Sequence, residues 1–112
     1  NTGVSVAKGE WIKPVDDDDY LAPNCIEEMG AAIAQRPQAV ICSCQAIQVD
    51  GNGVEVTRTQ PCGIGKAFYV PQEDIHYGML LERVPFGTPI QVAFRKDAFL
   101  ASGGWDLALN VC

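Results

Sequence analysis

The sequence predicts an α/β fold in which a mixed sheet is combined with one crossover helix and one β-hairpin. Three features support this prediction: an apolar strand pattern that runs into four consecutive acidic residues, an amphipathic helix pattern directly after them, and a second strand pattern that ends at a strong turn signal. The predicted order is helix, strand, acidic loop, helix, strand, hairpin, strand and helix. Ligands of open α/β sheets bind at the carboxyl ends of strands, so the acidic residues mark the expected site.

The first elements precede the acidic residues. Residues 2–8 are typical of the end of a short helix, because Lys8 suits a last turn and Gly9 suits the left-handed position after it. Residues 11–15 then predict a short strand. Pro14 has no N–H to donate to a neighbouring strand, so we expect it near an edge or at the strand end.

Residues 23–36 give the clearest helix pattern. Pro23 fits its first turn, and two glutamates lie near its positive N-terminal end. Pro37 ends it, because the residue before a proline disfavours the helical conformation. The apolar face recurs at helical spacing and consists of Ile26, Met29, Ala32 and Ile33.

The second half of the chain alternates strands with turns. Residues 39–49 predict one strand, and the Asp-Gly-Asn-Gly turn at residues 50–53 leads into a second strand at residues 54–57, which makes a hairpin. The segment after it is rich in Gly and Pro and predicts a loop. The remaining expected elements are a short helix, a strand and another short helix, at residues 74–84, 90–94 and 95–101.

Composition restricts the classes of function. The 112 residues allow one domain, and 47% hydrophobic with 20% charged residues is ordinary for a folded protein. The formal net charge of -6, without a Lys/Arg cluster, argues against nucleic-acid binding through phosphates. No apolar run approaches the roughly 20 residues of a transmembrane helix. Five cysteines without a secretory signal predict free thiols and a cytoplasmic setting, with any membrane association made through other parts of the protein.

The acidic run Asp16-Asp17-Asp18-Asp19 indicates a cation site. Four adjacent carboxylates repel each other, and a divalent cation removes that cost. In an extended backbone Asp16 and Asp18 project to the same side and can offer two oxygen ligands to Mg²⁺ or Mn²⁺, with water and ligand phosphates completing the shell. A solvated acidic surface loop is the alternative.

Two stretches of the sequence resemble the inverting family-two glycosyltransferases, which have the GT-A fold. Residues 1–24 contain an Asn-x-Gly helix, a Gly and an aromatic residue before the strand, and an Asp-x-Asp-Asp followed by Leu-x-Pro. Residues 92–106 contain a strand, a short helix and Gly-Gly-aromatic-Asp in succession. Both stretches in this order make the resemblance more specific than a bare Asp-x-Asp.

The resemblance implies a glycosyltransferase that uses Mn²⁺ or Mg²⁺ and a nucleotide-diphosphate sugar, a UDP-sugar in the first place, to glycosylate a hydroxyl of a sugar or glycan acceptor. Asp18 would be the main protein ligand of the cation. Asp16 would contact the ribose or metal side of the uridine-type sugar nucleotide. The implied donor-binding residues are Asp16, Asp17, Asp18, Gly103, Gly104 and Trp105. From the residues alone, the glycine pair could equally be a plain helix C-cap and turn, and Trp105 a core residue.

The resemblance also implies that residues 1–112 form a single partial domain, without the N-terminal nucleobase-binding half and the segment after Cys112. The family's catalytic base has no match, since Asp106 belongs to the preceding segment, so the catalytic residue stays unknown. We expect little activity from these residues alone. An exposed sheet edge would allow a homo-oligomer. Two alternatives remain: a non-catalytic binding or assembly module with a degenerate glycosyltransferase fold, and a metal-dependent nucleotidyl-transfer enzyme.

Overall fold

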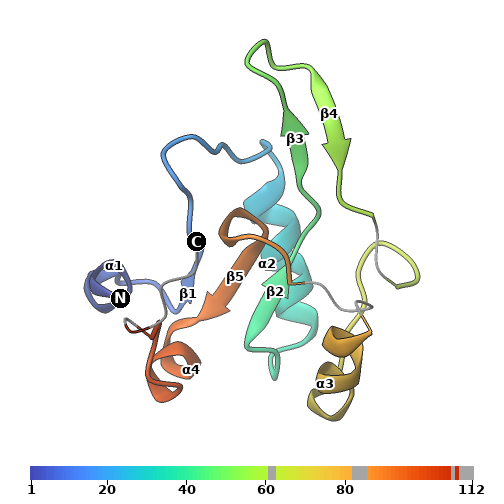
Figure 1. Ribbon diagram of the computed structural model, residues 1–112. Coiled ribbons are helices and arrows are strands. Elements are labelled where there is room, and N and C mark those ends of the chain that lie inside the picture. Colours follow the sequence, from blue (N-terminus) through green and yellow to red (C-terminus); the bar gives the residue numbers. More distant parts are fainter. Residues whose placement is uncertain (61–62, 82–85, 107, 109–112) are drawn as a thin grey trace.

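The computed structural model describes residues 1–60, 63–81, 86–106 and 108, and it has the predicted α/β class (Figure 1). The helical elements are α1 (Thr2–Val6), α2 (Cys25–Gln35), α3 (Gln72–Leu80), the 3₁₀ turn η1 (Pro89–Gln91) and α4 (Lys96–Ala101). The strands are β1 (Trp11–Ile12), β2 (Ile41–Ser43), β3 (Ile47–Val49), β4 (Glu55–Arg58) and β5 (Val92–Arg95).

A three-stranded sheet in the order β1-β5-β2 forms the centre of the fold. The last strand in the sequence, β5, lies between the other two and is antiparallel to both, with Phe94 opposite Ile12 on one side and Ile41 on the other. Strands β1 and β2 therefore run in the same direction on either side of β5. Helix α2 is the crossover connection between them and packs against β2 (Figure 1).

The core is small and centred on β5. Its buried apolar side chains come from α1, α2 and β5, and they are Val4, Met29, Ala93 and Phe94. The Phe94 ring stacks on that of Phe99 in α4, with a centroid distance of 4.8 Å. The central strand and helix α4 thus meet at Phe94.

Helix α1 ends earlier than predicted, and a different lysine binds its last turn. Ala7 is already extended, so Lys8 and Gly9 follow the helix and do not close it. The carbonyls left free at its end are bound by the Lys96 ammonium, which donates to the Ser5 oxygen at 3.2 Å and the Ala7 oxygen at 2.6 Å. A cation at a helix C-terminus is favourable, and here it comes from the far end of the chain.

Helix α2 lies within the predicted range but begins at Cys25, with Asn24 as N-cap, so the placement of Pro23 in its first turn was wrong. Met29 is buried on the predicted apolar face, whereas Ile26 is 58% exposed. The three-residue strand against which the helix packs covers only part of that face.

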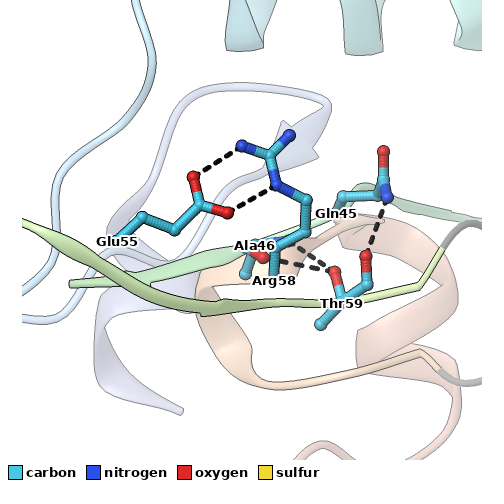
Figure 2. Close-up of polar contacts among 5 residues, drawn as sticks. All are labelled: Gln45, Ala46, Glu55, Arg58 and Thr59. Atoms are coloured by element: carbon cyan, nitrogen blue, oxygen red, sulfur yellow. Dashed lines mark hydrogen bonds and ion pairs between the residues drawn. The ribbon is translucent and has the colours of Figure 1, made fainter.

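The single strand predicted at residues 39–49 is two strands in two different sheets. Between β2 and β3 the chain leaves the central sheet, and Cys44 exchanges two hydrogen bonds with Gln91: the Cys44 N–H donates to the Gln91 carbonyl at 2.9 Å, and the Gln91 Nε2 donates to the Cys44 carbonyl at 3.0 Å. The Ala46 N–H then donates to the Thr59 hydroxyl at 2.8 Å (Figure 2). Side chains distant in sequence therefore end β2.

Other boundaries differ by a few residues. The strand at residues 11–15 is reduced to Trp11–Ile12, and the Lys13 ammonium after it donates a hydrogen bond to the Ile90 carbonyl. A 3₁₀ turn takes up the start of the strand expected at residues 90–94. The helix expected at residues 74–84 is α3, and residues 82–84 lie outside the described part.

The thiols of Cys25, Cys42 and Cys44 are free, while the other two cysteines fall outside the described residues. Burial, together with the nearby Cys25, raises the pKa of Cys42 and of Cys44, so both favour the neutral thiol. Among the described residues, no helix is long and apolar enough to cross a membrane.

The predicted hairpin is confirmed as β3 and β4, which extend beyond the central sheet (Figure 1). The Asp50 carboxylate accepts hydrogen bonds from the N–H groups of Asn52 at 2.8 Å and Val54 at 2.9 Å, which closes the turn. In β4, the Arg58 guanidinium and the Glu55 carboxylate form two hydrogen bonds of 2.7 and 2.9 Å (Figure 2). The hairpin therefore relies on polar contacts of its own.

We expect the hairpin turn to loosen in acid. The N–H donors of Val54 and Asn52 lower the pKa of Asp50, so its contribution to folding is complete above the ordinary pKa near 3.8 and is lost as the pH falls through the lowered value. The amide proton shifts of Asn52 and Val54, followed by NMR from pH 7 to pH 2, should report this loss. Asp50→Asn keeps an acceptor without a charge and should remove the dependence; unchanged shifts in the wild type down to pH 2 would contradict the expectation.

Candidate functional site

The acidic residues form a turn shortly after the carboxyl end of β1. The Asp19 N–H donates to the Asp16 carbonyl at 3.2 Å, which places Asp17 and Asp18 at the centre of the turn. The extended backbone on which the two-sided alternation of these carboxylates was predicted is therefore absent. Asp16, Asp17 and Asp18 are exposed, and Asp19 is half-buried. Consecutive carboxylates thus face solvent next to the central sheet.

The charge of this turn has no ion-pair partner within the described part of the chain. The ion pairs found there join Arg58 to Glu55, Lys66 to Glu28 and Arg95 to Asp97. The nearest lysine in sequence, Lys13, uses its ammonium on the carbonyls of Pro14 and Ile90. Repulsion among the four carboxylates is therefore left to solvent or to a bound cation.

The described residues include no group of three or more His, Cys, Asp or Glu arranged to hold a metal ion. A cation at the turn would therefore be bound by only one or two of these side chains. It would take its other ligands from water and from a bound anion. Mg²⁺ is commonly held in this way in phosphate sites.

The glycine pair ends α4 in a helix C-cap. Gly103 and Gly104 have φ values of 90° and 75°, in the region that favours glycine, and the Gly104 N–H donates to the Phe99 carbonyl at 3.1 Å. The backbone thus has the C-cap geometry that was left open as an alternative. This geometry does not conflict with a second role in binding.

Trp105 follows the glycine pair and is 56% exposed, so it is not a buried core residue. Its indole meets the rings of Phe94 and Phe99 edge-on, with centroid distances of 6.3 and 5.4 Å. Such edge-to-face pairs are favourable, and they anchor the indole without covering it. An anchored and exposed aromatic face is therefore present at this position.

The first residue of the chain holds this segment in place, a contact that sequence reasoning missed. The Asn1 Nδ2 donates to the Trp105 carbonyl at 2.9 Å, and the Asn1 Oδ1 accepts from the Trp105 N–H at 2.9 Å. Asn1 is the N-cap of α1, yet its side chain makes no capping hydrogen bond there. The sequence signal was ambiguous, because an Asn before a helix ordinarily caps that helix.

No hydrogen bond or ion pair joins the acidic turn to the Gly103–Trp105 segment within residues 1–60, 63–81 and 86–106. They are connected through the sheet, since Trp105 packs on Phe94 and Phe94 pairs with Ile12. The four residues from Ile12 to Asp16 span at most about 14 Å. An open hollow of about 350 Å³ lies beside the glycine pair, between α1 and α4.

Comparison with known proteins gives two matches. The model of the family described as glycosyl transferase family 2 matches residues 1–102, a range that includes the acidic turn and ends just before Gly103. The chain is also 30% identical over 114 residues to an "uncharacterized glycosyltransferase" of Haemophilus influenzae. That alignment covers 98% of this chain and 35% of the relative, so the chain spans about a third of the relative's length. No solved structure matches.

Proposed function

The chain belongs to glycosyltransferase family 2, and from this premise we propose that it carries the cation and donor-diphosphate site of an enzyme that uses a nucleotide-sugar donor. The family implies a GT-A-like fold, which is partial here. The observation that supports the proposal most is the exposed acidic turn, which lies inside the matched range and has no ion-pair partner among the described residues.

In the proposed site, Asp18 is the main protein ligand of Mn²⁺ or Mg²⁺ and Asp16 is a second ligand on the ribose side. Asp17 contributes to the donor surface. These residues are exposed, so a diphosphate can approach them, and carboxylate oxygens are the ligands that such hard cations prefer. A bound divalent cation would neutralise the charge that develops on the departing diphosphate.

The sugar side of the site is assigned to Gly103, Gly104 and Trp105. The exposed indole can lie against an apolar sugar face, and the glycine pair leaves the backbone accessible beside it. This assignment places the sugar and the acceptor on the side of the sheet next to α4. The family resemblance implies that the acceptor hydroxyl attacks the anomeric carbon in line and with inversion of configuration, while the bond from that carbon to the diphosphate oxygen breaks. No residue of this chain is proposed as the general base.

We further propose that residues 1–112 are one part of a glycosyltransferase domain, because the chain aligns with 35% of the relative. A UDP-sugar as donor and a sugar or glycan as acceptor follow from the family resemblance.

A non-catalytic binding or assembly module is the second candidate. It is favoured because, among the described residues, no hydrogen bond or ion pair joins the acidic turn to the Gly103–Trp105 segment. A module of this kind would bind neither nucleotide nor cation.

The test is release of UDP from UDP-glucose and UDP-N-acetylglucosamine by the protein at its natural length, with Mn²⁺ and a mixture of sugar acceptors. Asp18→Ala should lower the rate by about 100-fold, because the cation provides several kcal/mol of transition-state stabilisation. Asp74→Ala removes an exposed carboxylate from α3 and should leave the rate unchanged. Equal rates in both variants, or full activity after chelation of the cation, would contradict the proposal.

A further inference from the structure

We propose that Asn1 is a positioning residue that fixes the indole of Trp105 as a surface for the sugar ring. The inference rests on the proposed function, because it assigns Trp105 to the sugar side. It adds a residue to which no role has been assigned, and it begins from the two hydrogen bonds between the Asn1 amide and the Trp105 backbone.

The two hydrogen bonds join the segment after α4 to the first residue of the chain. Both bonds are 2.9 Å long and connect residues 104 positions apart, so they fix the distance between the start of α1 and the end of the α4 turn. The Asn1 amide donates to the C=O and accepts from the N–H of the same residue, so it binds the two peptide units on either side of the Trp105 Cα and fixes their direction. Trp105 therefore has a defined backbone orientation although it is exposed.

The approach of Asn1 requires the glycine before Trp105. A Cβ at Gly104 would lie 2.8 Å from the Asn1 Oδ1 and 3.3 Å from the Phe99 ring, at a φ of +75°. At Gly103, by contrast, a Cβ would meet nothing within 4 Å. The space at Gly104 is thus filled by the side chain that binds Trp105.

The aromatic contacts then transmit the backbone orientation to the indole. Trp105 rests edge-on against Phe94 at 90° and against Phe99 at 67°. Phe94 is buried in the central strand, so one side of the indole packs against the core while the rest of it is exposed to solvent. Without Asn1, the backbone of Trp105 could rotate and these edge contacts would be lost. An aromatic ring contributes to ligand binding chiefly when it is held in place beforehand.

The experiment uses the protein at its natural length with Trp11→Phe, which removes the other tryptophan of this chain; any tryptophan outside it is also replaced by phenylalanine. Acrylamide quenching of Trp105 fluorescence is compared between the protein that keeps Asn1 and the Asn1→Ala variant. We expect stronger quenching and a weaker near-ultraviolet dichroism signal in Asn1→Ala. Asn1→Asp keeps the acceptor for the Trp105 N–H and should be intermediate. Ser5→Ala is the matched control, because it removes a 2.8 Å hydrogen bond within α1.

Binding then tests the positioning role. In the presence of Mn²⁺, Asn1→Ala should weaken the binding of UDP-glucose or UDP-N-acetylglucosamine by about fivefold, the effect of one net hydrogen bond, and leave the binding of UDP unchanged. Unchanged quenching in Asn1→Ala would overturn the inference, and so would an equal loss of affinity for UDP and for the UDP-sugars. Absence of Mn²⁺-dependent UDP binding in the wild type would instead refute the proposed function and with it the sugar role of Trp105, while the quenching comparison would still show whether Asn1 holds Trp105.

Discussion

Phe94→Ala should lower the free energy of unfolding by about 3–5 kcal/mol, the usual cost of removing a buried phenylalanine. Phe94 is 7% exposed and lies in the middle strand of the sheet, between Ile12 and Ile41. It also supports the rings of Phe99 and Trp105, so its loss leaves a cavity where strand, helix and turn meet. Urea denaturation, followed by near-ultraviolet circular dichroism, measures the change.

The matched control for Phe94→Ala is Tyr77→Ala in α3. Tyr77 is also aromatic but is 73% exposed, so its replacement should change the free energy of unfolding by no more than about 0.5 kcal/mol. Equal effects of the two substitutions would show that the cluster around β5 is not the core of this fold.

Gly104→Ala is the second substitution with a large expected effect. A side chain at a φ of +75° costs about 1–2 kcal/mol, and the contact with Asn1 and Phe99 adds about 1–3 kcal/mol. Asn1 could move aside, but only by losing both hydrogen bonds to Trp105. We therefore expect the free energy of unfolding to fall by about 2–5 kcal/mol, measured by the same denaturation.

Gly103→Ala separates the two causes, because its φ of +90° gives the same backbone strain without a close neighbour. Gly103→Ala should lower the free energy of unfolding only by the backbone-strain contribution of about 1–2 kcal/mol. In a double-mutant cycle, Gly104→Ala should be less costly when Asn1 is already alanine. Additive effects of Asn1→Ala and Gly104→Ala would mean that the contact with Asn1 is not the cause.

Local patterns predicted those elements whose stabilising contacts are local. The helix at residues 23–36 was recognisable from its apolar spacing and its proline boundary, and α2 lies within that range. The hairpin was recognisable because Asp50 and the glycines after it form a turn on their own, through bonds to Asn52 and Val54. The family resemblance was recognisable from short motifs, and the match over residues 1–102 confirms it.

Features that depend on distant residues could not be predicted. The pattern of residues 39–49 is continuous, and the break at Cys44 comes from Gln91, 47 positions away. The position of β5 between two earlier strands leaves no local trace either. The contact of Asn1 was not predicted either, because nothing near it in the sequence shows that its amide binds Trp105.

The acidic turn is an intermediate case. Its composition predicted a cation site, while the extended geometry assumed for Asp16 and Asp18 was wrong because the Asp19 N–H closes a turn. The cation site itself stays a prediction. The roles of the individual carboxylates stay predictions.

Titration calorimetry of UDP into the protein, with and without Mn²⁺, tests the central claim most directly. Wild type and Asp74→Ala should bind UDP only when Mn²⁺ is present, and Asp18→Ala should show no such binding. Binding that is indifferent to Mn²⁺, or that survives Asp18→Ala unchanged, would contradict the assignment of the acidic turn as the donor-diphosphate site.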